Sequence, residues 1–334
     1  MKELIKNITE IYSPSGREDE VRNFIISQIK DYVDEYKIDK IGNLIAFKKG
    51  RSGKTILFDA HMDEIGLVIT HISDNGFYKV EAVGGVDPQT LIGCRVQFKN
   101  RTGVLGVEGE TLEDLKNNSK NLSFENLYLD LGFSCRTQAE EFAPIGTFGT
   151  YIACFADLGD RIVSKAMDDR VACAVLIENI RNMKDCLNNI IYAFTVQEEV
   201  GLVGSSVAGF NYDIDMAVAV DVTAAGDTPK ALKRISMELG KGPCIKIKDA
   251  ASVSDIVVVN KLKQAAQANM IPFQFEVLLF GGTNAASYQR TKSGIPSGTI
   301  SITTRYVHSP NEMVSMDDVE NTVKLVAALS NTEI

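Results

Sequence analysis

Residues 55–66, TILFDAHMDEIG, join a short apolar run to side chains that can bind metal. The run TILFDA is typical of a buried β-strand, because a strand covered on both faces does not alternate between apolar and polar residues. His61 and Asp63 follow the run directly. The stretch therefore predicts a central strand that ends at a functional edge of a sheet.

Downstream of residue 165, apolar runs alternate with stretches of helical period. We expect helices over 170–183, 253–270, 284–290 and 316–330, and strands over 188–196, 215–222, 272–280 and 297–304. Such alternation predicts an α/β fold with a sheet covered on both faces. Upstream, residues 4–33 carry a helical period and residues 38–50 are typical of a hairpin. The expected architecture is a central mixed sheet flanked by helices.

Residues 67–159 have a different pattern, with short β-like pieces between turns rich in Gly and Asn. The pieces lie at 67–72, 77–83, 95–99, 103–109 and 146–155. One helical stretch, near 124–126 or around 137–141, is expected to interrupt them. We predict a small β-barrel-like domain over 67–159, inserted into a catalytic domain formed by 1–66 and 160–334.

Composition excludes several classes of protein. The chain has 334 residues, of which 45% are apolar, and no apolar run is long enough to span a bilayer. Its N-terminus has the pattern of an amphipathic helix and not of a signal peptide. The six cysteines are scattered without a CxxC pair, which predicts no disulfide framework and a reducing, cytoplasmic environment. A net charge of −9 disfavours nucleic acid as a partner.

Four predicted strands lead into side chains that can bind metal. These side chains are His61, Glu198 with Glu199, Asp221 and His308. Ligands bind at the carboxyl ends of the strands in open α/β sheets, so we expect the side chains to lie close together. Asp168 precedes the helix over 170–183 and is a candidate for its N-cap.

Imidazole and carboxylate ligands without thiolate suit catalytic zinc, cobalt or manganese. Three carboxylates and two neutral imidazoles would balance two divalent ions and one hydroxide, and a shared carboxylate would hold the ions roughly 3.5–4 Å apart. Taken singly, each residue also has an ordinary interpretation as a solvated loop residue or a helix cap. Their shared position at strand ends favours the metal site, and both interpretations stay open at this point. His71, the third histidine, is expected to be structural.

Seven motifs resemble, in their order, those of the tetrahedral (TET-type) aminopeptidases, a group of co-catalytic metallopeptidases that includes glutamyl aminopeptidases. The motifs are YSPSGRE at 12–18, AHMDEIG at 60–66, VGGVDPQTLIGCRV at 83–96, KAMDDR at 165–170, QEEVGLVGS at 197–205, AVDVT at 219–223 and RYVHSP at 305–310. The resemblance covers almost the whole chain. It implies a zinc-peptidase-like fold and a metal-dependent aminopeptidase that releases N-terminal residues from short peptides.

The resemblance also assigns roles to individual residues. Asp168 would bridge two metal ions, His61 with Asp221 would hold one ion, Glu199 with His308 would hold the other, Glu198 would be the general base acting on a water between the ions, and Asp63 would orient the imidazole of His61. Asp169 is the weaker candidate for the bridge. The resemblance implies two divalent ions per subunit, with zinc favoured over cobalt or manganese. It also implies a homo-oligomer, from dimer to dodecamer, joined through the inserted domain.

Two segments depart from the family pattern. In GGTNAAS, residues 281–287, Asn284 stands where the family commonly has an acid. We expect a turn with a helix cap there, and, if the segment lines the substrate pocket, a preference for cationic substrates is in doubt. The segment 106–118, GVEGETLEDLKNN, lacks the usual Pro and His, and a variant loop without effect on the metal site is expected.

Two other functions compete with the aminopeptidase. Paired carboxylates could serve an endoglucanase-type glycoside hydrolase, a label given to some relatives. That function explains neither the histidines nor Asp168, and the chain has no tryptophan to form a sugar platform. A non-catalytic scaffold that kept the fold would be expected to lack a ligand or the base, and all of them are present. The sequence does not determine the native metal or the preferred N-terminal residue.

Overall fold

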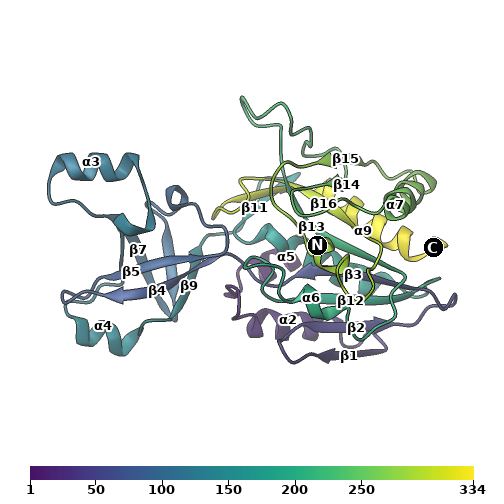
Figure 1. Cartoon of the computed structure of the whole chain (residues 1–334), viewed down its shortest axis with the longest axis horizontal. Helices are drawn as coiled ribbons and strands as arrows, with labels where there is room; N and C mark the ends of the chain where they lie inside the picture. The colour runs from purple at the N-terminus through teal and green to yellow at the C-terminus, as the bar shows by residue number, and fades with distance from the viewer.

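The computed structural model describes all 334 residues and has two bodies, a larger α/β domain and a small barrel beside it (Figure 1). The barrel strands follow β3 (Thr55–His61) along the chain and precede β11 (Arg161–Ser164). Both termini lie in the larger domain. The chain therefore leaves the α/β domain once, forms the barrel, and returns.

The larger domain is built on a sheet of 11 strands. Their order is β1 (Glu35–Ile38), β2 (Leu44–Lys48), β12 (Asn189–Thr195), β3, β13 (Met216–Ala224), β16 (Ser297–Arg305), β17 (Glu312–Ser315), β11 and β10 (Ala156–Asp157), with β14 (Cys244–Lys248) beside β16 and β15 (Gln274–Val277) beside β14. The four central strands β12, β3, β13 and β16 are parallel, and antiparallel strands extend the sheet on both sides. The predicted mixed sheet is confirmed.

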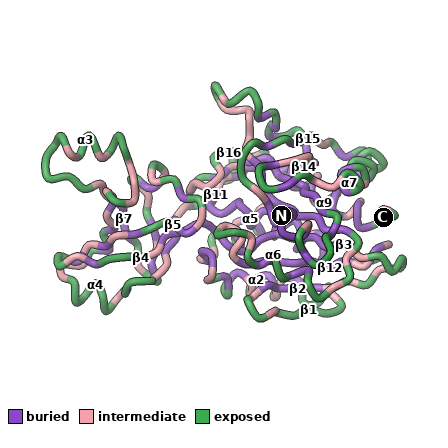
Figure 2. Tube along the Cα trace, in the orientation of Figure 1, coloured by how far each residue is buried: buried purple, intermediate pink, exposed green.

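Successive side chains of a strand point to opposite faces, and both faces of the central strands are apolar. On β3, Ile56 and Phe58 pack in the main core, whereas Leu57 packs on the opposite face. The main core lies under α1 (Lys2–Thr9), α2 (Asp19–Ile29), α5 (Met167–Asn182), α7 (Ile256–Ala268) and α9 (Met316–Ser330), and the opposite face under α6 (Ser205–Ala208) and α8 (Ala285–Tyr288). Burial is concentrated in these central layers (Figure 2). None of the helices is both long enough and apolar enough to cross a lipid bilayer.

The inserted segment closes into a six-stranded antiparallel barrel, as the sequence predicted. Around it the order is β4 (Gly66–Ile72), β5 (Tyr78–Val83), β8 (Leu127–Asp130), β7 (Arg101–Val107), β6 (Arg95–Phe98) and β9 (Phe148–Ile152). A separate core of 17 buried residues fills it. Two short 3-10 helices, η1 (Pro88–Thr90) and η2 (Phe124–Asn126), and two α-helices, α3 (Leu112–Lys120) and α4 (Arg136–Phe142), connect the strands.

Several predicted elements differ from the observed ones. The helical period over 4–33 is split into α1 and α2, because Pro14 forms an isolated bridge with Glu64 and Gly16 adopts a positive φ of 80°. The strand expected over 272–280 is reduced to β15. The expected loop at 106–118 contains most of α3, which begins with a capping box between Thr111 and Asp114. α3 lies on the side of the barrel away from the α/β domain.

Glu64 joins the two bodies at the start of the barrel. Its buried carboxylate accepts hydrogen bonds from Ser13 N at 3.0 Å, from Thr150 Oγ1 of β9 at 2.8 Å, and from Lys165 Nζ at 2.6 and 2.8 Å. The guanidinium of Arg170 lies 3.7 Å away. One carboxylate therefore fixes the N-terminal segment, the barrel and the approach to α5 with respect to one another.

We expect Glu64→Ala to lower the free energy of unfolding by about 3–5 kcal/mol, because Lys165 and Arg170 would stay buried without their counterion. Chemical denaturation followed by circular dichroism measures this change. Glu108→Ala is the matched control, since Glu108 pairs with Lys79 at 2.7 Å on the exposed surface of the barrel. That control should change the free energy by less than about 1 kcal/mol, and equal losses in the two variants would contradict the role of Glu64.

Candidate metal centre

The carboxyl ends of the central parallel strands bring the candidate side chains together. His61 is the last residue of β3, and Asp221 lies in the last half of β13. Glu198 and Glu199 follow β12, and His308 follows β16. Asp168, from the first turn of α5, completes the set at the same edge.

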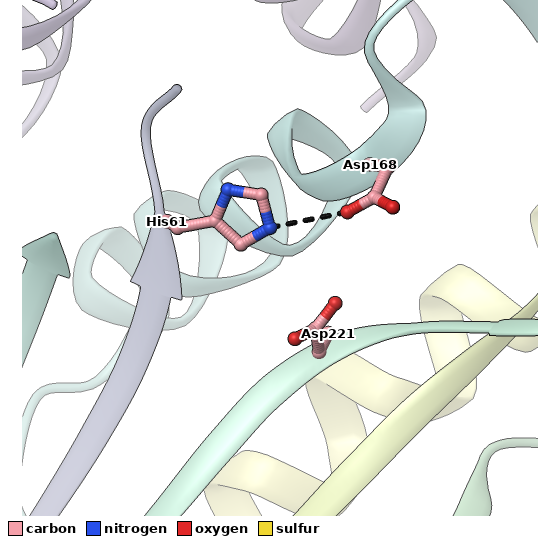
Figure 3. A group of neighbouring side chains, drawn as sticks. All are labelled: His61, Asp168 and Asp221. Carbon is pink, nitrogen blue, oxygen red and sulfur yellow. Dashed lines mark hydrogen bonds and ion pairs between the residues drawn. The ribbon is translucent and has the colours of Figure 1, made fainter. Parts of the chain in front are cut away.

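These side chains form two groups that share Asp168. In the first group, ligand atoms of His61, Asp168 and Asp221 lie within 4.8 Å of one another, and Figure 3 shows the three side chains facing a common point. In the second group, Asp168, Glu199 and His308 meet the same criterion. Asp168 Oδ1 lies 3.1 Å from His61 Nε2, and Asp168 Oδ2 lies 3.3 Å from His308 Nε2. The two oxygens of one carboxylate thus face two different groups.

Asp168 is not the N-cap of its helix, contrary to the sequence-based expectation. The cap position of α5 is Ala166, which has a positive φ of 53°, and no side chain caps the helix. Asp168 and Asp169 have non-helical backbone angles within the first turn. The backbone N–H of Asp168 donates to Glu312 Oε2 at 3.0 Å, which leaves the carboxylate directed at the two histidines.

Asp169 lies behind the site. Its Oδ2 accepts the backbone N–H of His61 at 3.2 Å, and it belongs to neither group of candidate ligands.

Asp63 contacts both His61 and the turn that carries Glu198 and Glu199. Its Oδ1 accepts the backbone N–H of Glu198 at 3.0 Å and lies 3.3 Å from His61 Nδ1. Its Oδ2 accepts from Glu199 N at 3.2 Å and from Ser15 Oγ at 2.6 Å. One buried carboxylate therefore orders both the imidazole and the turn that carries the two glutamates.

Glu198 lies beside the two groups without belonging to either. Its Oε2 is 3.9 Å from His61 Nε2, and its side chain borders the main cavity. This position suits a group that exchanges a proton with a substrate or water and does not bind metal.

The centre holds several carboxylates in a buried space. Burial, and then the charge of Asp168, raise the pKa of Asp221 to about 7. Burial also raises the pKa of Glu198 well above its usual range, and the attraction of His61 offsets only part of this. For Asp168, burial alone would raise the pKa, but hydrogen bonds from His308 and His61 hold it below its usual range. Cations bound among these carboxylates would therefore stabilise their ionised form.

The hydrogen bonding of His308 tests whether the residues fit a metal. Its Nδ1 lies 2.9 Å from Gly85 O, and a carbonyl oxygen can only accept, so Nδ1 carries the hydrogen. Its Nε2 then faces Asp168 Oδ2 and Glu199 Oε2, each 3.3 Å away. Burial would lower the pKa of His308, but these two carboxylates raise it to about 12. A divalent ion bound by Nε2 would take the place of the proton that this position otherwise requires.

Other buried atoms support the same fit. Glu199 Oε1 is buried without a hydrogen-bond partner and is free to bind a cation. Burial would lower the pKa of His61, but Glu198, Asp168 and Asp63 together raise it well above its usual range. The donor set therefore suits two divalent cations, one in each group, with nitrogen and oxygen ligands only.

Two residues that hydrogen-bond to the candidate ligands, Glu312 and Gly85, were not predicted from the sequence. Glu312 is buried and accepts the backbone N–H groups of Asp168 and His308, and burial, followed by the charge of Asp168, raises its pKa to about 8. Gly85 comes from the barrel. Gly85 lies within the motif at 83–96 and Glu312 lies two residues beyond the motif at 305–310, but neither residue stands at the end of a predicted strand that points to the site.

Asn284 occupies the N-cap position of α8, as expected, but its side chain makes no capping hydrogen bond. Gly281 and Gly282 of the same segment border the cavity, whereas Asn284 does not. Its buried amide donates to Asp59 Oδ1 at 2.6 Å and to Thr195 Oγ1 at 2.9 Å, beneath the sheet edge. The amide donates a hydrogen bond to Asp59 without placing a second negative charge against that carboxylate. His71 lies exposed on β4 and takes no part in either group of ligands.

A cavity of about 680 Å³ opens onto the centre. Asp168, Glu198, Glu199, Asp221 and His308 all border it, together with apolar side chains that include Leu278 and Phe280. A site with apolar walls and a few convergent polar groups is the usual form of a small-molecule or peptide site.

The model of the M42 glutamyl aminopeptidase family matches residues 42–325 of the chain. A curated relative from Acetivibrio thermocellus is 46% identical over 328 residues, which span 98% of this chain and 97% of the relative. The lysyl aminopeptidase of Pyrococcus furiosus is 36% identical over 336 residues, which span 98% and 96% of the two chains.

Solved structures agree with the sequence relatives. The TET1 peptidase of Pyrococcus horikoshii, which can assemble into a tetrahedron or a large octahedral shell, has 34% identity and a TM-score of 0.87 over 98% of each chain. A protein from Thermotoga maritima named as an endoglucanase has 35% identity and a TM-score of 0.82, over 98% of this chain and 96% of that one. The similarity to the TET1 peptidase includes the sheet and the inserted barrel.

We expect removal of the metal ions to destabilise the folded protein, because the clustered carboxylates then lose their cations. Zinc at about 1,000 times its dissociation constant should stabilise the folded state by about 4 kcal/mol for each ion bound. Differential scanning calorimetry of chelator-treated protein, with and without added zinc, measures this as a rise of several degrees in the unfolding midpoint.

Asp168→Asn serves as the comparison variant for this experiment, because Asp168 belongs to both groups. It should lose most of the response to zinc. An equal rise in midpoint in the wild-type protein and the variant would contradict binding at this centre.

Proposed function

This chain belongs to the M42 glutamyl aminopeptidase family, and we propose that it removes N-terminal residues from short peptides with two metal ions shared through Asp168. One observation carries the proposal: the two oxygens of Asp168 face His61 and His308 at 3.1 and 3.3 Å, with a further carboxylate beside each imidazole. Two adjacent cation positions that share one carboxylate are the arrangement of a two-metal hydrolase.

The assignment of ligands follows the two groups. His61 and Asp221 hold one ion, Glu199 and His308 hold the other, and Asp168 joins them. When bound, the ions would polarise the scissile carbonyl and lower the pKa of the attacking water. Zinc is favoured by the mixed imidazole and carboxylate donors, with cobalt and manganese as alternatives.

Glu198 is proposed as the general base. It takes the proton of the attacking water and delivers it to the amine that leaves. Its place at the cavity, outside both groups, and its pKa raised by burial support a carboxylate that can hold a proton at neutral pH. Asp63 keeps Glu198 in reach, because it accepts the backbone N–H of that residue and lies against the imidazole of His61.

The assembly and location are also proposals. We propose a homo-oligomer, from dimer to dodecamer, in which the barrel over 67–159 forms the dimer contact. The shells formed by the TET1 peptidase of Pyrococcus horikoshii support this assembly. Six unpaired cysteines are consistent with a cytoplasmic enzyme.

Glu198→Gln should reduce kcat by at least about 100-fold while both metal ions stay bound, because only the proton acceptor is lost. Steady-state kinetics on an aminoacyl chromogenic amide, with metal content measured on the same sample, tests this. Glu320→Gln, on the exposed face of α9, is the control and should keep full activity. Retained activity in Glu198→Gln would remove Glu198 as the base.

Substrate preference is resolved by a panel of Glu, Asp, Leu, Lys and Ala chromogenic amides, each run with zinc, cobalt or manganese. We expect hydrolysis of at least one amide, dependent on added metal and abolished by a chelator. Activity on a β-glucan that survives chelation would instead support the glycoside hydrolase, in agreement with the name of the Thermotoga maritima relative.

The oligomer is tested by size-exclusion chromatography with multi-angle light scattering. We expect a mass that corresponds to two or more subunits of 36.5 kDa. A monomer at every concentration would contradict the proposed assembly.

A further inference from the structure

We propose that the Gly84–Gly85 turn of the barrel positions His308 and Glu199, so that the barrel sets the affinity of one of the two metal ions and not of the other. This inference rests on the proposed two-metal function. It concerns positioning residues outside the set of ligands, in the barrel that lies beside the α/β domain.

The turn follows β5 and reaches across to the loop after β16. The carbonyl of Gly85 accepts the hydrogen bond from His308 Nδ1 at 2.9 Å. This contact selects the tautomer and the ring orientation that leave Nε2 facing Asp168 and Glu199. A ring nitrogen that binds metal generally depends on such a partner for its other nitrogen.

The turn fits against the centre only because it lacks side chains. A Cβ on Gly85 would lie 2.6 Å from His308 Nδ1 and 2.8 Å from Cε1, so the imidazole would have to move. A Cβ on Gly84, which has a positive φ of 82°, would lie 3.1 Å from the Cβ of Glu199. Both glycines therefore touch ligands of the same group, the one formed by Asp168, Glu199 and His308.

The barrel holds the turn in place on both sides. Val83 pairs with Gly66 of β4, and Val86 is buried in the barrel core. The backbone N–H of Val86 donates to Gly84 O at 3.0 Å, which closes the turn. The barrel is in turn fixed to the α/β domain by Glu64, which accepts a hydrogen bond from Thr150 of β9.

The other group of ligands has no such dependence. His61, Asp168 and Asp221 all come from elements of the α/β domain, and the partners of His61 Nδ1 and Nε2, Asp63 and Asp168, lie on the same body. His308 takes support from both bodies, because its backbone N–H donates to Glu312 of β17 while its ring contacts the barrel. A displaced turn should therefore lower the affinity for the ion held by Glu199 and His308 and leave the affinity for the other ion unchanged.

The test is a calorimetric titration of metal-free, full-length protein with zinc. The wild-type protein should bind two ions. Gly85→Ala should bind one ion with unchanged affinity and the other about 10- to 100-fold more weakly, the usual effect of losing an outer partner of a metal ligand. The zinc retained after dialysis should fall from two ions to one per subunit.

Gly93→Ala is the matched control. Gly93 lies in the same module, has a positive φ of 76°, and has no atom within 4 Å of an added Cβ, so the change strains the barrel without reaching the centre. It should still bind two ions with wild-type affinity. Equal loss of affinity in Gly85→Ala and Gly93→Ala would overturn the inference, because the effect would then be general to the fold.

Val86→Ala provides a second variant that introduces no clash. It loosens the barrel core behind the turn and should weaken the binding of the same ion, though by less than Gly85→Ala does. If Gly85→Ala does not fold, this variant tests the inference alone. Wild-type affinity for both ions in a folded Gly85→Ala or Val86→Ala protein would overturn the inference and leave the two-metal function standing. Failure of the wild-type protein to bind two ions would overturn both.

Discussion

The constraint on which the site depends is the repulsion among carboxylates buried at one edge of the sheet. Asp168 and Asp221 are buried with His61, and the side chains of Glu198 and Glu199 beside them are only 12% and 5% exposed. Buried carboxylates of like charge cannot all stay ionised unless cations lie between them. The pKa values show the conflict, since that of Asp221 is raised to about 7 while that of Asp168 is lowered. Two divalent ions would resolve this conflict, and they would also supply the chemistry of the proposed peptide hydrolysis.

The surrounding structure keeps these charges from moving apart. Asp63 and Glu312 accept backbone N–H groups next to the ligands, and Asp168 leaves the regular helix so that both its oxygens face imidazoles. The barrel takes part through Gly85 and is fixed by the ion pair of Glu64 with Lys165. The inserted barrel thereby contacts the centre, which links the position of the barrel to the geometry of His308.

Much of this could be predicted from the sequence, because it depends on local patterns. The buried strand that ends at His61, the closing helix over 316–330 and the β character of the insert all follow from periodicity. The contacts of Gly85 and Glu312 could not be predicted, since they join segments that are distant in sequence or lie in loops without a period. The packing of Asn284 against Asp59 and the absence of a cap at Asp168 likewise depend on tertiary neighbours. The grouping of ligands came from family resemblance, and the structure supplies the distances.

The most direct test of the account is a crystal structure of the zinc-loaded protein, with anomalous diffraction recorded at the zinc absorption edge. We expect two anomalous peaks roughly 3.5–4 Å apart, one among His61, Asp168 and Asp221 and the other among Asp168, Glu199 and His308. A single peak, or two peaks that do not share Asp168, would contradict the account.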